Sequence, residues 1–261
     1  MTIHSSADEH ANAGFGIIPP GEGAECCSAR DAGAGCIVAG DPAGRRIVLV
    51  HASSTDARAW NRLLRAVPAG QEWVSVARHD PGPAIAGFIG DSAAAARLVL
   101  GGDPTAQAAA LRPLLTLRRA RKPILVGCGT GVPVALRAAL DVPDLVGGLL
   151  LIDPAVAEAA RSGVLRRIAA RLLPSTIRST AAELQSMAPL LASIRVPVTL
   201  VQGKDEPPGL LGTPFLEQSL SGCRNLTVVT VPGAHVQPAK HESAVRTALS
   251  ALVAAVERGG A

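Results

Sequence analysis

Short runs of β-branched residues alternate along this chain with longer stretches rich in Ala, Leu and Arg that have helical spacing. The short runs have the length of strands and carry little charge, as expected for strands that are buried on both faces. This alternation is typical of βαβ units, in which parallel strands are joined through helices. The sequence therefore predicts an α/β fold with a mostly parallel sheet flanked by helices.

Eight segments have the strand pattern, at residues 26–30, 36–39, 46–51, 73–77, 123–127, 148–153, 196–202 and 225–231. Helices are expected to begin near residues 55 and 91 and to cover 105–119, 130–140 and 240–257.

Two stretches depart from the alternation and define the predicted organisation of the chain. Residues 1–22 are rich in Ser, Ala, Gly and Pro, so we expect a flexible N-terminal arm. Residues 154–195 are helical in pattern and interrupt the series of strands. We expect them to form a small helical cap over a core made of residues 23–153 and 196–261.

The composition argues against several classes of function. Hydrophobic residues make up 48% of the chain and charged residues 18%, which is enough apolar sequence for a sizeable core. The formal net charge is only +4, and basic residues are not interleaved with aromatic ones, so we expect no nucleic-acid partner. No apolar run of about 18 residues and no secretory pattern at the N-terminus occur, which predicts a cytoplasmic protein without a membrane span.

The cysteine pattern gives no reason to expect a metal or another cofactor. The chain has five cysteines, an odd number, and no two of them form a C-x-x-C pair. No histidine lies at metal-ligand spacing from any of them. Free buried thiols are therefore the simplest expectation.

The segment Gly127-Cys128-Gly129-Thr130-Gly131 lies between a predicted strand and a predicted helix. A strand that turns sharply into a helix needs small residues, because the backbone is strained and crowded there. Dinucleotide-binding turns share this feature, but Val132 stands where their third glycine belongs. The segment instead has the spacing of a G-x-S-x-G nucleophile elbow with glycine at its centre.

Three further segments follow predicted strands: His51-Ala52-Ser53-Ser54, Gly203-Lys204-Asp205-Glu206-Pro207 and Val231-Pro232-Gly233-Ala234-His235. Together with the glycine-rich turn, and in this order, they resemble the α/β-hydrolase family over about residues 25–258. The resemblance implies an oxyanion loop at residues 51–54 and a catalytic histidine at His235. It places the acid at Glu206, with Asp205 as the alternative, and the nucleophile position at Gly129.

The departures from the family pattern determine the predicted chemistry. Gly129 cannot form an acyl-enzyme, because glycine has no side chain. Ala52 replaces the family's glycine beside the oxyanion hole, whose donors are backbone N–H groups. His235 with Glu206 still forms an acid–base dyad. We therefore predict non-covalent chemistry on a small apolar substrate: cyclisation, elimination, decarboxylation or water-mediated hydrolysis.

The substrate is expected to contact the loops around this dyad, at Ala52, Ser53, Cys128, Thr130 and His79. His79 with Asp80 is an alternative acid–base pair at the pocket mouth. Five arginines of the predicted cap form either a solvated helix face or a surface that attracts an anionic or carrier-linked substrate; they are Arg161, Arg166, Arg167, Arg171 and Arg178. The oligomeric state does not follow from the sequence.

Two other functions compete with this prediction. The chain is alternatively an inactive relative of the hydrolases that kept its pocket as a ligand-binding or scaffold module. A weaker alternative is a thiol hydrolase that uses Cys128. Against it, the residue before the centre of an elbow points away from the pocket into the packing.

Overall fold

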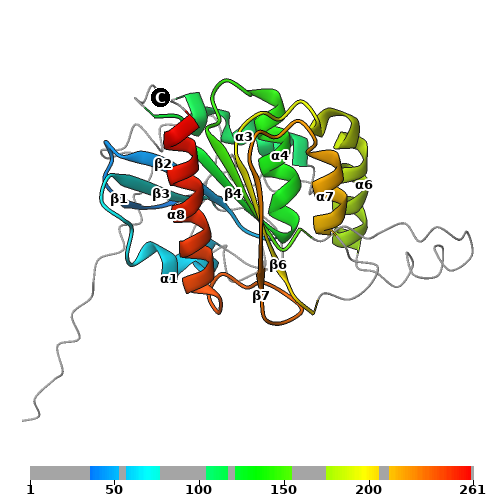
Figure 1. Cartoon of the computed structure of the whole chain (residues 1–261). Helices are drawn as coiled ribbons and strands as arrows, with labels where there is room; N and C mark the ends of the chain where they lie inside the picture. Colours follow the sequence, from blue (N-terminus) through cyan, green and yellow to red (C-terminus); the bar gives the residue numbers. More distant parts are fainter. Residues whose placement is uncertain are drawn as a thin grey trace, which may run out of the picture.

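The computed structural model describes residues 36–52, 57–76, 104–116, 121–154, 175–205 and 212–259. These residues form a seven-stranded sheet in the order β1-β3-β2-β4-β5-β6-β7, with helices on both faces (Figure 1). β1 runs antiparallel to β3, and every other neighbouring pair is parallel. The predicted α/β class and mostly parallel sheet are confirmed. The eighth predicted strand, at residues 26–30, lies outside the described residues.

The strands are β1 (Cys36–Gly40), β2 (Arg45–Val50), β3 (Gln71–Val76), β4 (Ile124–Cys128), β5 (Gly148–Ile152), β6 (Val198–Gly203) and β7 (Leu226–Val231). The helices are η1 (Ala57–Trp60), α1 (Asn61–Leu64), α3 (Pro104–Thr116), η2 (Gly129–Gly131), α4 (Val132–Asp141), α6 (Ser175–Leu191), α7 (Gly212–Ser219) and α8 (Glu242–Gly259). The sequence pattern did not predict α7, and the helix expected near residue 91 lies outside the described residues.

Two hydrophobic clusters cover the two faces of the sheet. The first cluster joins the sheet to α3, α4, α6 and α7, and the second joins it to η1, α1 and α8. Successive residues of a strand point to opposite faces, so Val48 of β2 belongs to the first cluster and Leu49 to the second. β2, β4 and β5 are buried along their whole length, which explains why they read as continuous strands in the sequence.

The region predicted as a cap contains a helix that packs into the core. In α6 the side chains of Leu184, Met187 and Leu191 are buried and belong to the first cluster. Figure 1 shows α6 in the same helical layer as α4 and α7. Residues 175–191 thus form part of the layer that covers the sheet. Residues 155–174 of the expected cap, and the expected arm at 1–22, lie outside the described residues.

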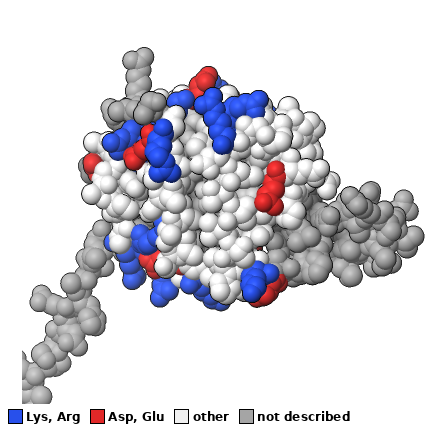
Figure 2. Space-filling view, in the orientation of Figure 1, with Lys and Arg blue, Asp and Glu red and all other residues white. Residues whose placement is uncertain are grey.

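Charged side chains are unevenly spread over the face seen in Figure 1. Figure 2 shows Lys and Arg gathered at two opposite ends of this face, with a largely uncharged surface between them. α8 contributes to that surface, since residues 247–256 carry no charge. On this face, the basic residues therefore do not form one continuous patch.

Candidate active site

The turn between β4 and α4 has the backbone geometry of a nucleophile elbow. Gly129 has a φ of +52°, in the left-handed region that favours glycine. A Cβ at Gly131 would lie 2.4 Å from the carbonyl oxygen of Val50, and one at Gly127 would lie 2.7 Å from that of Gly131. The flanking glycines are thus required because backbone segments approach each other closely, as in the strained turn of an elbow.

The two departures from the hydrolase pattern lie next to each other in space. A Cβ added at Gly129 would lie 3.1 Å from the Cβ of Ala52, and among the described residues, chain neighbours apart, that methyl group is the only atom it would meet within 4 Å. A contact of 3.1 Å between two carbon atoms is shorter than the preferred separation of about 3.5–4.0 Å. A side chain at position 129 would therefore crowd Ala52.

His235 follows β7, and its ring lies against a carboxylate that the sequence did not point to. The Nδ1 atom is 3.3 Å from Oδ2 of Asp153, which directly follows β5. The His235 side chain is 53% exposed and the Asp153 side chain only 17%. The backbone N–H of Val236 also donates to the Asp153 carboxylate. One carboxylate thus holds the histidine through both its ring and the next backbone amide.

Asp153 itself has a strained backbone. Its φ of +50° makes it the one non-glycine residue with positive φ among the described residues. Its N–H donates to the carbonyl oxygen of Val201 in β6 at 2.8 Å, which fixes the turn after β5. Non-glycine residues in this conformation are concentrated at functional sites, where the surrounding structure enforces them.

Burial raises the pKa of the Asp153 carboxyl group above its ordinary value. The charge of His235 and the hydrogen bonds from the His235 ring and the Val236 amide act in the opposite direction, with a smaller effect. A carboxylate shielded from water interacts more strongly with the few donors that it has. The arrangement therefore strengthens the hold of Asp153 on the imidazole ring.

The two acids predicted from the sequence have different outcomes. Glu206 lies outside the described residues. Asp205 follows β6, is exposed, and accepts a hydrogen bond from the Gly233 N–H at 3.2 Å. Its own N–H donates to the Gly233 carbonyl at 3.1 Å. Asp205 thus braces the backbone of the histidine loop, whereas the carboxylate at the ring of His235 is that of Asp153.

The remaining predicted site residues lie close to the elbow or outside the described chain. Cys128 is buried among apolar side chains of the second cluster, in agreement with a packing role. Thr130 is half-buried in η2, directly after Gly129. The His51 ring is buried beside the Ala52 carbonyl, with Nδ1 at 2.7 Å from the oxygen. Ser53, His79 with Asp80, and the arginines predicted at 161–171 lie outside the described residues.

Within the part of the chain that the structure describes, no three or more His, Cys, Asp or Glu side chains are grouped so that they would hold a metal ion. None of the described helices is long and apolar enough to cross a membrane.

Comparison with protein-family models and with curated proteins finds no match. Solved structures do match. A haloalkane dehalogenase variant from Bradyrhizobium elkanii is 14% identical, with a TM-score of 0.63, over 87% of this chain and 94% of that one. A thermophilic esterase from Thermogutta terrifontis is 19% identical, with a TM-score of 0.59, over 85% and 93%. A membrane phospholipase A described as a bacterial virulence factor is 18% identical, with a TM-score of 0.62, over 86% and 83%.

These neighbours share one architecture, and the chain has the α/β-hydrolase fold. At 14–19% identity the likeness establishes the fold and leaves the reaction to be argued from the site.

Proposed function

We propose that this protein is an enzyme in which His235 acts as a general acid or base, oriented by Asp153, without a covalent intermediate. The observation that carries the proposal is the 3.3 Å contact between the His235 ring and Asp153, at the same edge of the sheet as an elbow that has no nucleophile. Asp153 takes the orienting role that the sequence pattern gave to Glu206. The expected substrate is a small, largely apolar organic molecule.

The geometry supports acid–base chemistry at one particular atom of the histidine. When Nδ1–H donates to Asp153, the lone pair of Nε2 is left to accept a proton. The His235 side chain is about half exposed, and the carboxyl ends of β4 and β7, which precede Gly129 and the His235 loop, lie at the same edge of the parallel sheet. Proton abstraction followed by elimination, cyclisation or decarboxylation fits this arrangement, and so does activation of a water molecule for hydrolysis.

One observation favours a second candidate, a ligand-binding module without turnover. The methyl group of Ala52 crowds the position where a nucleophile would stand, as expected if the site no longer needs one. This candidate predicts ligand binding that is unchanged in a His235→Ala variant. The thiol hydrolase has no such support, because Cys128 is packed in the second cluster.

The first prediction tests whether the rest of the catalytic site is intact. Gly129→Ser alone is expected to give weak esterase activity on nitrophenyl acetate, because the new Cβ would lie 3.1 Å from Ala52. Gly129→Ser with Ala52→Gly removes that contact and should be faster than the single variant; a tenfold gain would correspond to a relief of about 1.4 kcal/mol in the transition state. Adding His235→Ala or Asp153→Ala should abolish the gain.

Circular dichroism of every variant provides the control for folding. A double variant that folds and remains inert would contradict an intact acid–base site and would favour the ligand-binding module. Activity that persists in the His235→Ala background would remove His235 from the mechanism. Equal activity of the single and double variants would show that Ala52 shifts away from the new serine side chain without lowering the rate.

A further inference from the structure

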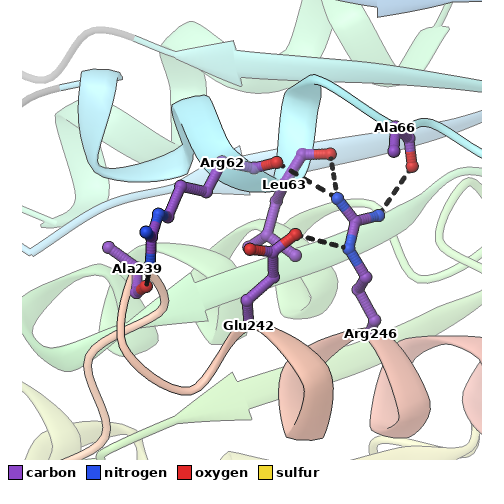
Figure 3. Close-up of polar contacts among 6 residues, drawn as sticks. All are labelled: Arg62, Leu63, Ala66, Ala239, Glu242 and Arg246. Atoms are coloured by element: carbon purple, nitrogen blue, oxygen red, sulfur yellow. Dashed lines mark hydrogen bonds and ion pairs between the residues drawn. The ribbon is translucent and has the colours of Figure 1, made fainter.

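Arg246, on α8, donates to the end of a short helix from another part of the chain (Figure 3). Its Nη1 lies 2.6 Å from the carbonyl oxygen of Ala66, and its Nη2 lies 2.8 Å from that of Leu63 and 3.1 Å from that of Arg62. Its Nε pairs with Glu242, one helical turn earlier, at 3.0 Å. The two terminal nitrogens of the guanidinium group thus join α8 to α1, while its Nε is held within α8.

The helix that receives these bonds is too short to be stable alone. α1 has four residues, and its N-cap residue Trp60 makes no side-chain capping bond. The last carbonyl groups of any helix lack partners within it, and one turn of helix forms at a cost in conformational entropy. Arg246 supplies both the missing donors and a positive charge at the negative end of the helix. The position of α1 therefore depends on α8.

Arg62 makes the connection to the candidate active site. Its backbone carbonyl is held by Arg246, and its side-chain Nη1 donates to the carbonyl oxygen of Ala239 at 2.9 Å. Ala239 lies in residues 232–241, the loop between β7 and α8 that carries His235, which we call the histidine loop. Figure 3 shows the Arg62 side chain reaching from α1 to Ala239 in this loop, and the Arg246 side chain reaching from α8 to the end of α1.

The second hydrophobic cluster includes residues from both α1 and the histidine loop. Val236, next to His235, is buried in the second cluster together with Trp60 and Leu63 of η1 and α1. Its backbone N–H is the group that donates to Asp153. Displacement of α1 would therefore act on the histidine loop directly at Ala239, and would disturb the cluster in which Val236 is buried.

We propose that Arg62 and Arg246 are positioning residues that fix the histidine loop on Asp153 through α1. The expected effect of these arginines on catalysis rests on the proposed role of His235. Their effect on the position of the histidine loop does not.

The two arginines make different numbers of bonds, which gives a sharp test by substitution. Arg62 uses one N–H on Ala239, and a lysine ammonium group provides one such donor. Arg246 binds three carbonyl oxygens and one carboxylate in a planar arrangement that lysine does not reproduce. Arg62→Lys should therefore restore what Arg62→Ala loses, and Arg246→Lys should not restore what Arg246→Ala loses.

The experiment measures amide hydrogen exchange of Val236, because this amide reports directly on contact with Asp153. We expect exchange at Val236 to accelerate about tenfold or more in Arg62→Ala and Arg246→Ala, while amides of β5 keep the wild-type rate, as for a local opening. The control is Arg195→Ala. Arg195 also binds two backbone carbonyls, those of Ala192 and Gly222, but it precedes β6 and lies at the edge of the sheet opposite the histidine loop. That variant should leave Val236 unchanged.

Unchanged exchange at Val236 in folded Arg62→Ala and Arg246→Ala would overturn the inference, and so would equal acceleration in Arg195→Ala. A parallel measurement in the Gly129→Ser, Ala52→Gly background should show a lower kcat for Arg62→Ala and recovery in Arg62→Lys. The Gly129→Ser, Ala52→Gly variant could be inert while exchange at Val236 accelerates as expected. The proposed reaction would then be contradicted, and the positioning role of the two arginines would be supported.

Discussion

Asp153 concentrates several unfavourable features in one residue. It combines a positive φ, a largely buried carboxylate and a pKa raised by that burial. Each feature destabilises the folded state, and such features persist where function requires a residue in a fixed place. The contact with the His235 ring offers a functional explanation for these unfavourable features.

The balance at Asp153 predicts a dependence of stability on pH. A carboxyl group whose pKa is higher in the folded than in the unfolded protein favours folding below its ordinary pKa of about 4. This contribution is lost as the pH rises through the raised value. Asp153→Asn removes the charge, and asparagine readily adopts a positive φ. We expect the variant to melt at a higher temperature than the wild type at pH 8, with a difference that shrinks toward pH 4.

Thermal unfolding followed by circular dichroism between pH 4 and pH 8 measures this effect. Asp205→Asn is the matched control, since Asp205 is exposed and supports the same histidine loop. It should change the melting temperature little at either pH. A wild type that stays more stable than Asp153→Asn at pH 8 would mean that the contact with His235 outweighs the penalty of burial.

At this scale the sequence pointed to Gly129 and His235 but not to Asp153. The elbow and the histidine loop are recognisable because local backbone geometry imposes their glycines. The partner of the histidine depends on which strand end faces the loop, and β5 is separated from β7 by β6 in the sheet. A signal was present in retrospect, because Asp153 is an acidic residue at the end of a wholly apolar strand beside the elbow strand.

At the scale of elements, the sequence predicted those strands and helices whose stability comes from a regular apolar pattern. The buried strands agree with the predicted segments to within about two residues, because burial on both faces leaves a continuous apolar run. A helix was predicted to begin near residue 55, where η1 and α1 follow, whereas the short helix α7 was not predicted, since helices of this length are stabilised by tertiary contacts. The start of α7 shows this, because a Cβ at Gly212 would overlap the carbonyl group of Pro154.

α6 provides a prediction that tests whether this helix belongs to the core or to a separate helical cap. Leu191 is fully buried against the first cluster, whereas its neighbour Leu190 is 52% exposed. Leu191→Ala should lower the free energy of unfolding by about 2–5 kcal/mol, through lost burial and the cavity left behind. Leu190→Ala should change it by less than about 0.5 kcal/mol. Urea unfolding of both variants measures the difference, and equal effects would place α6 outside the cooperative core.

For the whole molecule, the sheet is the structure that both hydrophobic clusters share. β2, β4 and β5 send alternate side chains into the first and second clusters, so neither cluster is complete without these strands. The chain contains two tryptophans, Trp60 and Trp73, and both belong to the second cluster. Tryptophan fluorescence therefore reports on one face of the sheet, while far-UV circular dichroism reports on all helices.

This asymmetry allows a test of whether the two faces unfold together. Leu191→Ala weakens the first cluster, and Leu249→Ala weakens the second, where Leu249 is 2% exposed. Because the strands are shared, we expect each variant to lower the urea midpoint equally by fluorescence and by circular dichroism, as in a two-state transition. If Leu191→Ala shifted the circular dichroism midpoint and left the fluorescence midpoint in place, the two faces would unfold separately. The histidine loop, whose Val236 belongs to the second cluster, would then be stabilised by that face of the sheet.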